Sequence, residues 1–298
     1  MFDYLSHTAM AEVLFKKYRD NGDIINDFFS LQRFKTYSLG VSLSDLKLNN
    51  IPHIYGTQKL FFNMIDFIKN NNLTCDYDAV NLLYGHISHY FYDININPYI
   101  LYLSFDLERF GKIRSDDIIK SYLSNYLLEK LYNKNIFDFK EECFNNTKIS
   151  DSSKGMINDT YKKIYNKSNV YRSYLHTINL LKELENIKDL FLFQKICEKM
   201  ISFKDFLSLN KLTVNEILNK DKDVWYNPVT GKSNNSSYDE LLDKAILDTS
   251  FAIKEVNQVL YNDKDKSSLE DVFCNLSYDT GEDLKLVEKK YYRKRDRK

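Results

Sequence analysis

The chain has 298 residues, 43% of them hydrophobic and 15% aromatic, which supplies apolar material for one large domain or two small ones. Lys and Arg together number 42, as do Asp and Glu, so no global charge draws the protein toward nucleic acid. Only 8 glycines and 3 prolines occur, and so few helix breakers favour a helical chain over a turn-rich β fold.

The N-terminal sequence MFDYLSHTAMAEVLF lacks the basic region, apolar stretch and small-residue cleavage site of a signal peptide. No apolar run reaches the roughly 20 residues needed to span a bilayer. We therefore expect a soluble, cytoplasmic protein without a transmembrane segment. The cysteines are widely spread without a C-x-x-C pair, which predicts reduced thiols at Cys75, Cys143, Cys197 and Cys274.

Apolar residues recur at helical spacing along most of the chain. The first helical pattern follows a candidate cap at Ser6, and the third ends before Pro98. Because the residue before a proline disfavours the α conformation, we expect the chain to turn at Asn97. The predicted helices cover residues 6–18, 57–72, 75–94, 115–133, 169–187 and 189–203.

Polar residues carry three further predictions: a loop, a helix cap and a basic tail. The sequence NNTKISDSSKG, residues 145–155, predicts a long loop. The Ser-x-x-Glu pattern from Ser237 to Glu240 is a capping box that begins the last long helix. The final ten residues, KKYYRKRDRK, predict a solvated basic tail. Together the patterns predict an all-α fold with a single multi-helix domain.

The sequence GHISHYFYD, from residue 85, brings metal-ligating side chains together. On a helix, His86, His89 and Asp93 are spaced i, i+3 and i+7, so they share one face. His89 and Asp93 are one turn apart and can reach the same ion, because zinc takes imidazole nitrogen and carboxylate oxygen as ligands. The alternative is an ordinary hydrogen-bonded pair on the helix surface.

Several blocks in the order of the chain resemble the zinc-dependent phospholipase C family, whose fold is shared with S1/P1-type nucleases. They are YSLGVSLSD at 37–45, HIYGTQKLFF at 53–62, GHISHYFYDININPY at 85–99 and WYNPVTGKSNNSSYDEL at 225–241. The resemblance implies an all-α phospholipase C-like domain over residues 1–262. Residues 263–298 would then form a C-terminal extension that ends in the flexible basic tail.

The resemblance also implies a set of metal ligands. Asp45, His53, His89 and Asp93 would build one zinc site, and Asp93 would bridge to a second zinc held by His7. Two such ions share and activate a water and clamp a phosphoryl group. Asp45 would be the catalytic residue that orients or deprotonates this water.

The chain departs from the family pattern at the third metal site. Asn97 and Ser104 stand where histidines are expected, while Glu108 is retained. Since amide and hydroxyl groups are poor zinc ligands, we expect one or two zinc ions and the loss of the third. Asn97 and Glu108 remain possible accessory residues. His86 is a third, either as a supporting donor or substitute ligand, or as a half-buried histidine hydrogen-bonded to a neighbour.

These observations lead to a functional hypothesis and two alternatives. The first is zinc-dependent hydrolysis of a phospholipid or a related small phosphodiester. The second is a non-catalytic zinc-binding or interaction protein of the same fold, which the changes at residues 97 and 104 favour. A nuclease is the third, but the neutral charge and the lack of a basic aromatic groove argue against nucleic acid as a partner.

Overall fold

The chain is described here from a computed structural model. The structure describes residues 7, 12–14, 31–43, 56–105, 115–132, 148–176, 207–208, 210 and 212–285. The described part is predominantly helical, which confirms the expected all-α class. The helices are α2 (Leu31–Ser42), α3 (Thr57–Asn70), α4 (Tyr77–Ser104), α5 (Ser115–Tyr132), α7 (Asp151–Tyr165), α10 (Val214–Leu218), α11 (Tyr238–Tyr261) and the 3-10 turn η2 (Lys266–Leu269).

The described strands are short. β1 (Trp225–Tyr226) and β2 (Ser233–Asn234) form one antiparallel hairpin, in which Trp225 is opposite Asn234. The Trp225 indole N–H donates to the carbonyl of Ser236 at 3.1 Å, and its ring lies 5.3 Å from the ring of Tyr99 on α4. The hairpin is thus anchored to α4 by a buried aromatic side chain.

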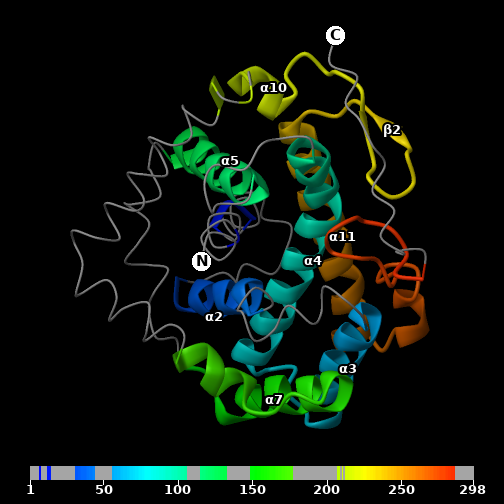
Figure 1. Cartoon of the computed structure of the whole chain (residues 1–298). Helices are drawn as coiled ribbons and strands as arrows, with labels where there is room; N and C mark the ends of the chain where they lie inside the picture. Colours follow the sequence, from blue (N-terminus) through cyan, green and yellow to red (C-terminus); the bar gives the residue numbers. More distant parts are fainter. Residues whose placement is uncertain are drawn as a thin grey trace, which may run out of the picture.

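Helix α4 is the centre of the fold, and α2, α3, α5, α7 and α11 all contact it (Figure 1). Apolar side chains surround its axis and most of its residues are buried, as expected for a helix in the middle of a core. Its first turn is capped by Asp76, whose carboxylate accepts hydrogen bonds from the backbone N–H groups of Asp78 and Ala79. The central helix carries His89 and Asp93 of the candidate site.

The predicted end of this helix was wrong. α4 does not turn at Asn97 but continues through Pro98 to Ser104. A proline inside a helix removes the N–H that would bond to the carbonyl four residues earlier, here that of Ile94. Tyr99, Ile100 and Leu103 follow the proline and are buried. Their packing explains why tertiary structure overrides the local preference.

The predicted loop at residues 145–155 was also wrong in its second half, because α7 begins at Asp151. Ser150 is the cap of α7, and its hydroxyl accepts from the backbone N–H of Ser153. The same hydroxyl donates to Asp76 at 2.7 Å, and the backbone N–H of Ser150 donates to Asp78 at 2.9 Å. The beginnings of α4 and α7 are therefore joined by hydrogen bonds.

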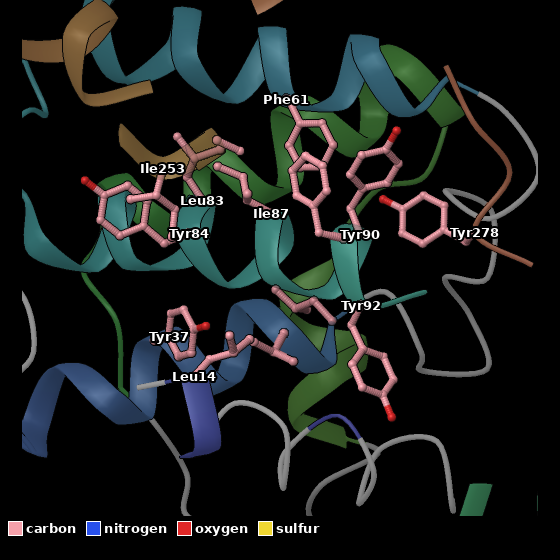
Figure 2. Close-up of a cluster of buried hydrophobic side chains, with 14 of the residues drawn as sticks. Leu14, Tyr37, Phe61, Leu83, Tyr84, Ile87, Tyr90, Tyr92, Ile253 and Tyr278 are labelled. Atoms are coloured by element: carbon pink, nitrogen blue, oxygen red, sulfur yellow. The ribbon is translucent and has the colours of Figure 1, made fainter. Parts of the chain in front are cut away.

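The residues after α11 are part of the same packed structure. The capping box of Ser237 and Glu240 is confirmed at the start of this helix. Farther along, Phe273 and Tyr278 are fully buried, and the ring of Phe273 stacks on Phe61 of α3. Figure 2 shows Tyr278 beside Tyr90 of α4, below Phe61. Residues 266–285 thus lie against α3 and α4.

Several expectations concern parts of the chain outside the described residues. These are most of the helix at 6–18, the helix at 189–203, much of the helix at 169–187, and the basic tail. Cys75 and Cys274 are free and exposed, whereas Cys143 and Cys197 lie outside the described residues. Within the described ranges, no helix is both long and apolar enough to cross a membrane.

Candidate metal centre

Three side chains from two distant parts of the chain meet beside α4. His89 and Asp93 lie one turn apart on this helix, and His7 comes from the N-terminal segment. The Nε2 atom of His7 lies 3.0 Å from Oδ1 of Asp93, and Nε2 of His89 lies 3.1 Å from Oδ2. The rings of His7 and His89 stack with their centroids 4.2 Å apart. Both imidazoles thus direct a nitrogen to the same carboxylate.

The three side chains are buried and electrostatically coupled. Their exposed fractions are 2% for His7 and 0% for His89 and Asp93. Burial alone would raise the pKa of Asp93, but the charges and hydrogen bonds of His89 and His7 hold the pKa of this carboxyl well below its usual range. Asp93 is therefore an anion in the protein interior, and positive charge beside it is favourable.

The composition and spacing of this group fit a divalent metal ion. Each residue offers one ligand atom, and these atoms all lie within 4.8 Å of one another. Tetrahedral zinc ligands at about 2.0–2.1 Å from the ion are roughly 3.3 Å apart. The observed separations of 3.0 and 3.1 Å need small adjustments for an ion to enter between the nitrogens and the carboxylate. Imidazole and carboxylate are also ligands that zinc accepts.

His86 does not join this group, although its spacing on the helix had placed it on the same face. Its Nδ1 lies 2.8 Å from the carbonyl oxygen of Leu82, and its Nε2 lies 3.4 Å from the hydroxyl of Tyr161 on α7. Burial lowers the pKa of His86 to about 4. His86 is thus a histidine hydrogen-bonded to its neighbours, which was the alternative to a role at the metal site. It is fully buried rather than half-buried.

The other expected ligands fall into two sets. Asp45, His53 and Glu108 lie outside the described residues. Asn97 and Ser104 are described, and neither side chain is part of the cluster. The Asn97 amide donates to the carbonyl of Tyr278 at 3.1 Å. The Ser104 hydroxyl donates to the carbonyl of Leu101 at 3.2 Å. Both side chains donate to backbone carbonyls.

Two tyrosines lie beside the cluster, and the sequence patterns assign neither of them to the metal site. The ring of Tyr92 meets that of His7 edge to face at 5.5 Å, and the ring of Tyr278 lies 5.5 Å from that of His89. Tyr92 directly precedes Asp93, but in a chain with 23 tyrosines it carries no distinctive signal. Tyr278 follows His89 by almost two hundred residues, and no local pattern connects them.

Comparisons of the chain with protein-family models, with curated proteins and with solved structures found no match. The buried group of His7, His89 and Asp93 could hold a metal ion on the evidence of its own geometry. The resemblance to zinc-dependent phospholipases C stays a prediction from the sequence motifs.

Proposed function

We propose that the protein binds zinc through His7, His89 and Asp93 and uses it to hydrolyse a small phosphodiester or phospholipid. The observation that supports this proposal is the convergence of two histidines on one buried carboxylate. Two imidazoles and one carboxylate are a ligand set of catalytic zinc sites, which keep a further position for water or substrate.

The protein residues would have separate tasks in such a reaction. When bound, zinc supplies a Lewis acid that activates water and stabilises charge on a phosphate. Without the ion, Asp93 holds both imidazole nitrogens toward the site through its two oxygens, and with the ion it would itself be a ligand. The surrounding core excludes bulk water and strengthens the electrostatic interactions. Asp45, whose role comes from the sequence resemblance, would accept the proton of the attacking water.

A metal-content measurement tests the first half of the proposal. Protein purified without a metal-binding tag and supplied with zinc is expected to hold one or two ions per chain. His89→Ala should remove the ion at this cluster, because it deletes a buried ligand. His176→Ala is the matched control, since His176 is exposed and lies outside the cluster. Equal zinc content in both variants and the wild type would contradict the assignment.

Hydrolysis is tested separately on the zinc-loaded protein. A panel of phospholipid and small phosphodiester substrates should reveal turnover that requires zinc and that Asp45→Asn abolishes. Because the resemblance makes Asp45 both the proton acceptor and a zinc ligand, the zinc content of this variant is measured beside its activity. Loss of turnover with the zinc content retained would assign Asp45 to proton transfer, and loss of both would assign it to metal binding. A protein that binds zinc but hydrolyses no member of the panel would refute the catalytic half alone.

The second candidate function is a structural zinc site in a non-catalytic protein. Two observations favour it: the three ligands are buried, and Asn97 and Ser104 donate to backbone carbonyls at positions where the family has histidines. A structural ion contributes directly to folding. In this case, chelation should lower the unfolding temperature of the wild type markedly, and no substrate of the panel should be hydrolysed.

A further inference from the structure

A tight turn near the C-terminal end of the described chain lies against the helix that carries the metal ligands. We call residues Ser277–Gly281 the C-terminal turn. The N–H of Gly281 donates to the carbonyl of Ser277 at 2.8 Å, and the N–H of Ser277 donates to that of Glu282 at 2.8 Å. An isolated bridge joins the flanking residues Leu276 and Asp283. The turn is therefore closed by its own backbone hydrogen bonds.

The turn approaches α4 at the position that Pro98 disrupts. Gly281 has a φ of +67°, and a Cβ atom built there would lie 2.5 Å from the carbonyl oxygen of Ile94 and 3.3 Å from Cγ of Pro98. The Ile94 carbonyl is the group that loses its helical N–H partner to the proline. A side chain at residue 281 would collide with it, so glycine permits this backbone contact.

Hydrogen bonds from α4 fix the chain at and before Tyr278. The Asn97 amide donates to the carbonyl of Tyr278 at 3.1 Å. The Tyr90 hydroxyl donates to the carbonyl of Cys274 at 2.6 Å. Both donors are buried residues of the ligand helix. The backbone of Tyr278 is thus held by the same helix that carries His89 and Asp93.

The Tyr278 side chain contacts the metal-ligating group directly. Its exposed fraction is 0%; its ring lies 5.5 Å from the ring of His89 and 5.3 Å from that of Tyr90. His89 also stacks with His7 at 4.2 Å. The imidazole of His89 therefore has an aromatic neighbour in Tyr278 as well as in His7.

We propose that Tyr278 is a positioning residue of the metal centre, through which the C-terminal turn sets the orientation of His89. The inference rests on the proposed metal site and adds a supporting residue from outside the ligand motifs. Groups that orient a ligating histidine strongly influence metal affinity. The turn is fixed by Asn97 and by the contact of Gly281 with Ile94, so displacing it should loosen the site without removing a ligand.

The test compares zinc affinity in full-length variants, measured by competition with a chromophoric chelator. Tyr278→Ala should weaken zinc binding several-fold, less than the roughly 10- to 100-fold typical for a lost hydrogen-bonding partner, because Tyr278 meets His89 through its ring. Tyr278→Phe should restore wild-type affinity, since it keeps the ring that meets His89. Tyr261→Ala is the control: Tyr261 lies at the end of α11, and its hydroxyl donates to the carbonyl of Thr74. This control should leave zinc affinity unchanged.

A second pair of variants tests the turn without altering Tyr278. Gly281→Ala should displace the turn from Ile94 and weaken zinc binding in the same direction as Tyr278→Ala. Gly155→Ala is the control, because Gly155 lies within α7 and a Cβ atom there would meet only Cζ of Phe67 at 3.6 Å, an ordinary contact. The visible absorption spectrum of the cobalt-substituted protein provides a readout that stability alone would not change. Tyr278→Ala and Gly281→Ala should alter the cobalt bands, and Gly155→Ala should not.

The outcomes separate the two proposals. Wild-type affinity and an unchanged cobalt spectrum in both Tyr278→Ala and Gly281→Ala would overturn the role of Tyr278 and leave the metal site intact. Failure of the wild type to bind zinc or cobalt would overturn the metal site and, with it, the role of Tyr278. If Tyr278→Ala does not fold, Gly281→Ala and Tyr278→Phe carry the comparison.

Discussion

Gly40 of α2 and Gly85 of α4 lie with their backbones in contact where the two helices cross. A Cβ atom at Gly85 would lie 2.3 Å from the carbonyl oxygen of Tyr37 and 2.7 Å from Cα of Gly40. A Cβ at Gly40 would lie 2.4 Å from the carbonyl oxygen of Leu82. Gly85 stands one helical turn before His89. The helix crossing therefore requires glycine at both positions and fixes α2 beside the part of α4 that carries His89.

Gly85→Ala should destabilise the protein strongly. The new methyl group would meet main-chain atoms of α2, which cannot rotate away as a side chain can. Overpacking of a close-packed core typically costs about 1–3 kcal/mol, and a backbone-to-backbone clash lies at the upper end of this range. The measurement is the free energy of unfolding in urea, made on metal-free protein.

Gly155→Ala is the control for this prediction. Gly155 lies within α7, where a Cβ would meet Cζ of Phe67 at 3.6 Å, an ordinary contact distance. Replacing a glycine inside a helix with alanine stabilises it by roughly 0.5–1 kcal/mol. The two substitutions are thus expected to change the unfolding free energy in opposite directions. A similar effect of both would show that α2 and α4 are not in close contact at Gly85.

The fold could be predicted best where one face of a helix is apolar. In α3, Leu60, Phe61 and Met64 recur at helical spacing, and all three are buried. The start of α11 could also be predicted, because a capping box is a local signal. The passage of α4 through Pro98 could not, since packing after the proline outweighs its local effect. The start of α7 was hidden because Ser150 and Asp151 are typical of loops as well as of helix caps.

The candidate site could be predicted where its geometry is local. His89 and Asp93 are one helical turn apart, and periodicity alone placed them together. His7 lies 86 residues before Asp93, so its inclusion depended on the family resemblance and not on spacing. Tyr278 could not be predicted by either route, because its place beside His89 results from the tertiary docking of the C-terminal turn.

Ser150→Ala should separate the beginnings of α4 and α7. The substitution removes the hydroxyl that caps α7 and also donates to Asp76 at 2.7 Å. Losing a helix cap costs about 1 kcal/mol, and leaving a partly buried carboxylate without this donor adds about 1 kcal/mol more. Urea unfolding of metal-free protein should therefore show a loss of about 2 kcal/mol.

Ser237→Ala provides the comparison for Ser150. Ser237 caps α11 in a capping box whose hydrogen bonds with Glu240 are exposed. Its loss should cost about 1 kcal/mol, the ordinary value for a cap. Equal losses for both serines would mean that the hydrogen bond from Ser150 to Asp76 contributes nothing to stability.

Asp93→Asn should abolish zinc binding at the cluster and destabilise the metal-free protein. The buried carboxylate accepts from His7 and lies beside His89, and breaking such a buried charge pair costs about 3 kcal/mol. The folded-state pKa of Asp93 is lowered, so this stabilisation is present above its ordinary pKa of 3.8 and is lost as the pH falls below that value. Zinc content and urea unfolding at neutral and acidic pH measure the two effects.

The control for Asp93 is Asp248→Asn. Asp248 accepts from Lys244 at 2.7 Å, but these side chains are 33% and 61% exposed. A solvent-exposed ion pair contributes at most about 1 kcal/mol. We expect full zinc binding and near wild-type stability in this variant. A comparable loss of stability from Asp248→Asn would show that burial is not the source of the Asp93 effect.

His86 should make the stability of the metal-free protein depend on pH in the mildly acidic range. Burial lowers the pKa of His86 from 6.5 to about 4 in the folded state. Between these values the unfolded chain binds a proton that the folded chain excludes, so stability falls as the pH decreases from 6.5 toward 4. The shift corresponds to about 3 kcal/mol at the acidic end. His86→Gln should remove this contribution, so its unfolding free energy should fall less over the same range. His176→Gln, at an exposed position, is the control and should show the same change of unfolding free energy with pH as the wild type. If His86→Gln also kept the wild-type dependence, the acid sensitivity would arise from other groups.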